Sequence, residues 1–245
     1  MNKLLIIIPV YNEEKTLEGT ISEITTYFDE HLAAGDNGTP YDIAIAGRSS
    51  TDGTNEIAER MAEKYENVFY SEIDHPYKGA RIHRISMTSD YAFYAFIDCD
   101  LPISVKEFYT IVREVVYNGS DMAIASKYVP GARQERPFSR VVTSRAYNFL
   151  VRLLLPMIKT HDALCGAKAW NRKVSETVFP QAMNTFYFFD TEILYYCFEK
   201  GYKVTEIPVF YKDMRTDSKV NVLNDSWTVG VTLLKFFVRK RILGK

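Results

Sequence analysis

The chain has 245 residues, which is enough for one α/β domain with a large core or for two small domains, and its 47% hydrophobic and 25% charged residues are ordinary for a globular protein. Its 30 basic and 31 acidic residues leave a formal net charge of -1, which argues against a general nucleic-acid-binding protein. The three cysteines form no CxxC pair, which argues against a disulfide framework or a zinc site and fits a reducing, cytoplasmic setting.

The first half of the chain alternates short apolar runs with amphipathic segments. The expected strands are residues 4–8, 43–46, 68–70, 91–97 and 122–125, and the expected helices are residues 15–28, 50–61, 80–88 and 105–116. This βαβα order predicts an α/β fold with a mostly parallel sheet and right-handed crossovers. Ligands bind beyond the carboxyl ends of the strands in such sheets, so residues 9–13, 47–54 and 98–100 are expected at one rim.

The second half is organised differently. It predicts helices at residues 144–158, 189–200 and 227–241, strands at 163–170 and 203–209, and a polar loop at 212–225. Because no repeat or low-complexity linker divides the chain, we expect one domain at residues 1–225 and a C-terminal helix at residues 226–245. That helix has an apolar face and a basic end, which is typical of an interfacial membrane helix and equally of a core helix with a solvated basic tail.

Two carboxylates, Asp98 and Asp100, directly follow the expected strand at residues 91–97. Hard oxygen ligands at this spacing suit Mg²⁺ or Mn²⁺ bound jointly with a diphosphate. A metal held there would neutralise the charge that develops on a departing nucleoside diphosphate. Because D-x-D is a common pattern, a solvated turn is the alternative interpretation.

A second candidate segment follows the first strand and contains Pro9, Tyr11 and Glu13. The Tyr11 ring is suited to stack on a nucleobase or ribose, and the Glu13 carboxylate is suited to accept a hydrogen bond from a ribose hydroxyl. The alternative is a loop that leads into a helix whose N-terminus carries favourably placed glutamates.

Several motifs occur in the order seen in glycosyltransferase family 2. They read IPVYNEE, STDGT, KGA, DCDL and SKYVPGA, followed by DALCGAKA, FDTEIL, GYKVTEIPV and RTDSK. The chain most resembles the dolichyl- or polyprenyl-phosphate sugar transferases of that family, over nearly its whole length up to about Lys219. The resemblance implies a GT-A fold, in which a Rossmann-like, mostly parallel sheet is flanked by helices.

The resemblance also implies roles for individual residues. Pro9, Tyr11 and Glu13 match nucleoside-contacting positions, while Asp98 and Asp100 match the metal and diphosphate positions. Three basic residues match positions near the nucleotide sugar or on a phosphate-contacting loop: Lys127, Arg215 and Lys219.

Three departures from the family pattern bear on the donor. Where the family has an acidic residue that accepts a hydrogen bond from the nucleobase, this chain reads GRSS, and Arg48 can only donate. The usual Gly-Lys-Gly becomes Tyr-Lys-Gly around Lys78, and Pro102 stands where the mannosyl subgroup often has a glutamine metal contact. Arg48, Ser49 and Lys78 thus match positions that bind the nucleotide sugar in the family. The sequence does not decide which nucleobase the donor carries, or whether the altered site binds a donor.

The implied reaction is the inverting transfer of a hexose from a GDP-mannose- or UDP-glucose-type donor to a polyprenyl or dolichyl phosphate. A phosphate acceptor is already ionised near neutral pH and needs no strong general base, so Arg215 and Lys219 would help to hold the phosphates. Such an acceptor favours peripheral contact with the cytoplasmic membrane face.

Two alternatives remain at this stage. If the acceptor is a sugar hydroxyl, as in polysaccharide or glycolipid synthesis, a carboxylate base is required, and Asp190 and Asp162 are the candidates. The other alternative is a non-catalytic nucleotide-sugar-binding relative, which the arginine at position 48 motivates.

Overall fold

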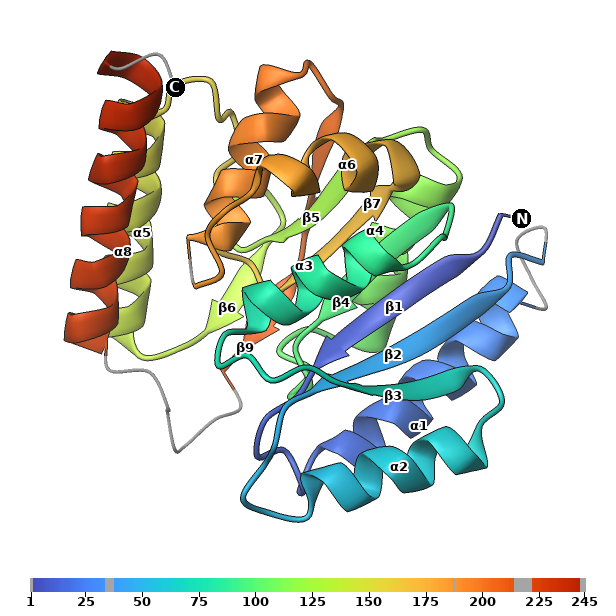
Figure 1. Ribbon diagram of the computed structural model, residues 1–245. Helices are drawn as coiled ribbons and strands as arrows, with labels where there is room; N and C mark the ends of the chain where they lie inside the picture. Colours follow the sequence, from blue (N-terminus) through green and yellow to red (C-terminus); the bar gives the residue numbers. More distant parts are fainter. Residues whose placement is uncertain (1, 34–37, 187, 214–221, 243–245) are drawn as a thin grey trace.

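The computed structural model describes residues 2–33, 38–186, 188–213 and 222–242 (Figure 1). The strands are β1 (Leu4–Pro9), β2 (Tyr41–Gly47), β3 (Val68–Glu72), β4 (Phe93–Ile97), β5 (Met122–Ser126), β6 (Arg133–Glu135), β7 (Ala167–Asn171), β8 (Val204–Pro208) and β9 (Phe210–Lys212). The helices are α1 (Leu17–Phe28), α2 (Thr54–Lys64), α3 (Lys78–Thr88), α4 (Val105–Val116), α5 (Phe138–Leu154), α6 (Arg172–Thr177), α7 (Phe189–Glu199) and α8 (Val222–Phe237).

Seven strands form one sheet in the order β3-β2-β1-β4-β7-β5-β8. All neighbouring strands are parallel except β7, which runs antiparallel to both β4 and β5. The mostly parallel sheet expected from the βαβα order is therefore confirmed. Because β7 is reversed, its amino end at Ala167 lies at the same rim as the carboxyl end of β4 at Ile97.

Both faces of the sheet are covered by helices, so its central strands are apolar on both sides. In β1, Leu4, Ile6 and Ile8 join the core under α1, α2 and α4. Leu5 and Ile7 join the second core, which packs under α3, α6, α7 and α8 on the opposite face. All five side chains have no exposed surface, which explains why this strand reads as an uninterrupted apolar run.

Helix α4 shows how a local signal anchors the rim of the sheet. The Ser104 hydroxyl accepts from the Glu107 amide at 3.3 Å, and the Glu107 carboxylate accepts from the Ser104 amide at 2.9 Å. This capping box fixes the start of the helix a few residues after the D-x-D segment. Glu107 also accepts a hydrogen bond from the Phe210 amide at 2.6 Å, which ties β9 to the same region.

The boundaries of several helices differ from those expected, and the difference is largest at the starts of α5 and α8. Helix α5 begins at Phe138, right after Pro137, and ends at Leu154, whereas residues 144–158 were expected. The start follows the proline, which is favoured beside the first helical turn, and Pro156 prevents the helix from continuing. Helix α8 begins at Val222 rather than at residue 227, and the last turn, Val238–Ile242, is π-helical.

A second, two-stranded parallel sheet of β6 and β9 was not expected from the sequence. Each of these strands has only three residues, which is too short to show the alternation by which strands are recognised.

Candidate functional site

The loops after β1 and β2 form one connected rim at the carboxyl ends of the strands. The Asn12 side chain donates to Thr51 Oγ1 at 3.0 Å and accepts from the Thr51 amide at 2.9 Å. The Glu13 amide donates to Thr54 Oγ1 at 2.7 Å. These bonds join two segments about 40 residues apart in the chain, at the rim where the sequence predicted them.

The D-x-D segment lies at the end of β4, the next strand along this rim. Between the two aspartates, Cys99 is 1% exposed, and its carbonyl accepts from Thr20 Oγ1 at 2.6 Å. The amide of Leu101 donates to the Asp98 carbonyl at 3.1 Å and closes a turn in which Leu101 has a φ of 44°. The buried cysteine thus fixes the backbone, and the two aspartates flank it on the partly exposed side.

Asp98 is held from two sides. The Lys78 ammonium, at the start of α3, donates to Asp98 Oδ1 at 2.7 Å. Burial by itself would lower the pKa of Lys78, but the carboxylates of Asp98 and Asp190 raise it above its usual range. On the other side, the Asp98 amide donates to the Gly166 carbonyl at 3.1 Å, and a Cβ atom at Gly166 would lie 2.1 Å from Asp98 Oδ2.

The donor set of this site fits a hard divalent cation bound together with a diphosphate. Within the described residues, no group of three or more His, Cys, Asp or Glu side chains could enclose a metal by itself. Asp100 and the second oxygen of Asp98 supply carboxylate oxygens, which Mg²⁺ and Mn²⁺ prefer. Mg²⁺ usually takes only one or two protein carboxylates and completes its shell with water and phosphate oxygens.

At the part of the rim formed by the loops after β1 and β2, Arg48 lies over the ring of Tyr11, with the guanidinium carbon 3.6 Å from the ring centroid. One face of this ring is therefore covered by a cation rather than open to a base. The Glu13 carboxylate accepts from Thr16 Oγ1 at 3.1 Å. Pro9 ends β1 in a buried position, and Ser49 is exposed.

Three candidate residues from the second half of the chain lie in buried ion pairs. Lys127 pairs with Asp162 at 2.6 Å, and the two side chains are 3% and 0% exposed. Lys168 pairs with Asp190 at 2.6 Å, with side chains 0% and 8% exposed. Burial would lower the pKa of Lys127, but Asp162 raises it above its usual range, so this lysine remains a cation committed to its partner.

Sequence reasoning did not identify two of the residues that shape this site, Lys168 and Gly166. A lysine inside the otherwise apolar strand AKAWN is the signal that could have pointed to a buried ion pair. Gly166 gave no comparable signal, since its need for a missing Cβ arises only from the approach of Asp98. Arg215 and Lys219 lie outside the described residues.

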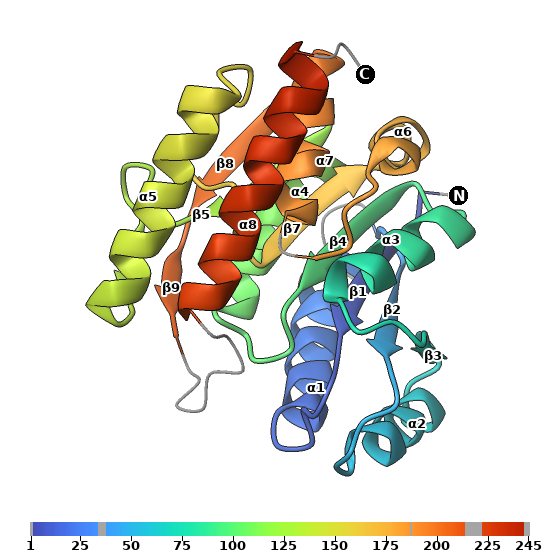
Figure 2. The same ribbon diagram turned by 60° about the vertical axis from the view of Figure 1, so that its left-hand side comes forward.

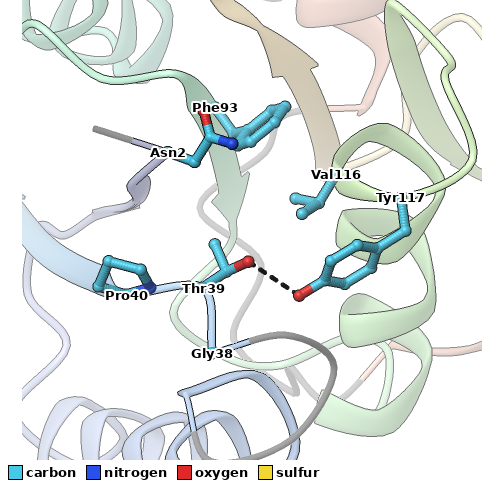
Figure 3. A pocket seen from close by; sticks show the side chains of 7 residues that line it. All are labelled: Asn2, Gly38, Thr39, Pro40, Phe93, Val116 and Tyr117. Carbon is cyan, nitrogen blue, oxygen red and sulfur yellow. Dashed lines mark hydrogen bonds between the residues drawn. The ribbon is translucent and has the colours of Figure 1, made fainter.

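A cavity of about 460 Å³ lies at the opposite rim of the sheet, by the amino ends of β1, β2 and β4. Its lining comes from the segments before β1 and β2, the start of β4 and the end of α4, and the side chains are drawn in Figure 3: Asn2, Gly38, Thr39, Pro40, Phe93, Val116 and Tyr117. The hydroxyls of Thr39 and Tyr117 lie 2.9 Å apart and are hydrogen-bonded across it. This cavity is thus separate from the D-x-D rim, where open α/β sheets bind ligands.

Comparison with known proteins places this geometry in context. The family model described as Glycosyl transferase family 2 matches residues 5–179. Glycosyltransferase AglD of Haloferax volcanii is 29% identical over 242 residues, covering 97% of this chain and 38% of that protein. Polyprenol monophosphomannose synthase of Mycolicibacterium smegmatis is 25% identical over 229 residues, covering 86% of this chain and 78% of that protein. Dolichol-phosphate mannosyltransferase of Pyrococcus furiosus is 30% identical over 178 residues, covering 72% of this chain and 48% of that protein.

The chain thus spans less than half the length of two of these relatives. Among solved structures, glucosyl-3-phosphoglycerate synthase from Mycobacterium tuberculosis in complex with Mn²⁺, UDP and glucosyl-3-phosphoglycerate has a TM-score of 0.73 at 17% identity, covering 96% of this chain and 79% of that one. Its complex with Mn²⁺, UDP-glucose and phosphoglyceric acid has a TM-score of 0.74 at 16% identity, covering 96% of this chain and 80% of that one. This likeness confirms the expected GT-A fold.

Proposed function

Because the chain belongs to glycosyl transferase family 2, we propose that it transfers a hexose from a nucleotide-diphospho-sugar to a polyprenyl or dolichyl phosphate, with inversion at the anomeric carbon. The observation that carries the proposal is the aspartate pair of Asp98 and Asp100 at the rim of a GT-A sheet, with Asp98 fixed by Lys78. The names of two relatives, a polyprenol monophosphomannose synthase and a dolichol-phosphate mannosyltransferase, support the class of acceptor.

In this proposal the donor diphosphate binds beside Asp98 and Asp100 together with Mg²⁺ or Mn²⁺. The bound metal supplies charge stabilisation for the leaving nucleoside diphosphate. Lys78 keeps Asp98 oriented, because its ammonium lies 2.7 Å from Asp98 Oδ1 and forms an ion pair with it. The nucleoside extends along the rim toward Pro9, Tyr11, Glu13 and the Arg48–Ser49 segment, in the order β4, β1, β2 of the sheet.

The ion pairs inside the fold favour a phosphate acceptor over a sugar hydroxyl. A hydroxyl acceptor needs a carboxylate that takes up its proton, and Asp162 and Asp190 were the two candidates. Each is buried and bound to a lysine at 2.6 Å, so protonating it would leave a cation buried without its partner. A phosphate oxygen is already a charged nucleophile and needs only to be aligned, a role we assign to the loop cations Arg215 and Lys219.

We also propose that α5 and α8 lie on the membrane that holds the lipid acceptor. The two helices pack side by side (Figure 2). Phe149 and Leu153 of α5 are 60% and 62% exposed, and Leu234 of α8 is 52% exposed, beside the cationic Lys235. Apolar side chains flanked by lysine or arginine are the composition of an interfacial helix. No helix within the described ranges is long and apolar enough to span a bilayer.

This apolar α5–α8 surface gives a direct test of membrane contact. Sedimentation with vesicles of mixed zwitterionic and anionic lipid should recover the protein, and the double variant Phe149→Asp/Leu153→Asp should lower the bound fraction by at least about tenfold, given the area each side chain would bury. Met87→Asp, at another exposed apolar side chain, is the matched control and should bind normally. Equal binding by the two variants would exclude this surface.

The transferase reaction itself is tested with purified protein, Mn²⁺, a short polyprenyl phosphate, and either GDP-mannose or UDP-glucose. Mass spectrometry of the lipid phase should detect a polyprenyl phosphate carrying one hexose, with the anomeric configuration opposite to that of the donor. Transfer to a polyprenol or glycan hydroxyl instead of the lipid phosphate would contradict the acceptor assignment. Binding of a nucleotide diphosphate in the presence of Mn²⁺ without transfer to any acceptor would instead support a non-catalytic nucleotide-sugar-binding relative.

A further inference from the structure

Two arginines from different elements meet at the nucleoside end of the rim. Arg48 follows β2 and lies on Tyr11, while Arg81 belongs to α3 and is only 3% exposed. The Arg81 guanidinium donates to the His75 carbonyl at 3.1 Å, and the nearby Ile73 amide donates to the Gly47 carbonyl at 2.8 Å, so the loop after β3 brings Arg81 to the end of β2, where Arg48 follows. Burial, followed by the positive charge of Arg48, lowers the pKa of Arg81 to about 10. The Tyr70 ring closes this corner, because a Cβ atom at Gly47 would lie 2.5 Å from it.

The donors of this arginine pair are incompletely used. Arg81 donates one bond, to the His75 carbonyl at 3.1 Å. Nε of Arg48 and Nε of Arg81 are both buried without a hydrogen-bond partner, as is the Tyr70 hydroxyl. Over the described ranges neither guanidinium forms an ion pair with a carboxylate. Buried charged donors without acceptors are costly, so this corner is built to receive acceptor atoms from a ligand.

Helix α3 connects this corner to the diphosphate end of the site. Lys78 and Arg81 are three residues apart and therefore share one face of the helix. Lys78 contacts Asp98 at the end of β4, and Arg81 contacts the loop after β3, which is hydrogen-bonded to Gly47 at the end of β2. Since β1 alone separates β2 from β4, the two ends are roughly 10 Å apart across the sheet. The arginine pair thus lies where the base of a donor held at Asp98 would arrive.

We propose that Arg48 and Arg81 read the nucleobase of the donor and select a base edge that presents two neighbouring acceptors. This inference rests on the proposed transferase function and adds the class of nucleotide. Guanine offers O6 and N7, and a guanidinium binds these two atoms in a bidentate fashion. Cytosine offers O2 and N3. Uracil has N3–H between its two carbonyls, and adenine has an amino group next to N7. Each of these bases would therefore present a hydrogen-bond donor to the donor groups of the arginines.

Calorimetric titration of the intact protein with GDP, CDP, UDP and ADP, each with Mn²⁺, tests this selection. We expect GDP or CDP to bind at least about tenfold more tightly than UDP and ADP, and the comparison of GDP with CDP identifies which acceptor-rich base is read. Arg48→Asp introduces an acceptor and should move the preference toward UDP, whereas Arg48→Lys keeps the charge but should lose most of the discrimination. Arg84→Ala, an exposed arginine of the same helix, should leave the ranking unchanged.

The possible failures are distinguishable. Equal affinity for all four nucleotides, or tightest binding of UDP, would overturn base selection by the arginine pair and leave the transferase proposal standing. An unaltered ranking in Arg48→Asp, with a thermal unfolding curve like that of the parent protein, would also overturn it, because Arg48 would then not face the base. No binding of any of the four would overturn both proposals together.

Discussion

Gly166 offers the sharpest test of how the fold positions the D-x-D segment. Replacing it by alanine adds one methyl group 2.1 Å from Asp98 Oδ2 and 2.9 Å from Asp98 Cγ. Ordinary contact requires at least 3.4 Å, so the carboxylate has to move by more than 1 Å or the start of β7 has to shift. Movement of the carboxylate disrupts the 2.7 Å bond between Asp98 and Lys78, and a shift of β7 disturbs the 3.1 Å bond from the Asp98 amide to the Gly166 carbonyl.

Two magnitudes follow from this clash. Overpacking of this kind costs about 1–3 kcal/mol in the free energy of unfolding. A displacement of about 1 Å at a reacting centre can cost roughly 100-fold in rate. We therefore expect Gly166→Ala to remain folded, to lose most of its Mn²⁺-dependent nucleotide affinity, and to retain on the order of 1% of the turnover.

Calorimetry with a nucleoside diphosphate and Mn²⁺, together with urea unfolding, measures both effects. The matched control is Gly19→Ala in α1, where a Cβ atom meets nothing within 4 Å. That variant should bind and turn over normally and gain up to about 1 kcal/mol of stability, since alanine is the better helix former. If Gly166→Ala also binds and turns over like the parent protein, the close approach of Asp98 to Gly166 is not what positions the site.

Three other predictions concern the charges and hydroxyls around the site. Asp100→Ala should abolish Mn²⁺-dependent nucleotide binding but leave the thermal unfolding temperature nearly unchanged, and metal-dependent binding that survives would remove the role assigned to Asp100. Asp190→Ala leaves Lys168 buried without its partner and should lower the free energy of unfolding by about 3–5 kcal/mol, measured in urea; a loss below about 1 kcal/mol would contradict the buried pair. Burial first, then the charges of nearby glutamates, raises the pKa of Tyr70 to about 12 from 10.0. The folded protein thus keeps this proton where the unfolded chain releases it, so stability should fall as pH rises from 10 to 12, and less steeply in Tyr70→Phe.

Local sequence signals were sufficient for the elements that build the rim. The run LLIIIP encodes a strand buried on both faces, because no polar side chain interrupts it. Ser104 and Glu107 encode the start of α4 within four residues, and the structure contains that capping box. The expected positions of Tyr11, Arg48 and Asp98 at one rim followed from the order of parallel strands alone.

The residue roles carried over from the family resemblance remain predictions. The structure shows contacts that limit the roles three of these residues can have. The Tyr11 ring is covered on one face by Arg48, and Lys127 is committed to Asp162. Asp190, expected as a candidate base, is committed to Lys168.

The sequence by itself determined the βαβα framework and the position of the carboxylate pair, since hydrophobic periodicity, caps and D-x-D all act over a few neighbouring residues. Only the tertiary structure decided the partners of those charges. Lys168 and Asp190 are 22 residues apart, and Lys127 and Asp162 are 35 apart. Their pairing depends on the insertion of β7 between β4 and β5 in reversed orientation. That insertion also brings Gly166 against Asp98. The order of the strands depends on the packing of the whole sheet, so no local sequence pattern predicts it.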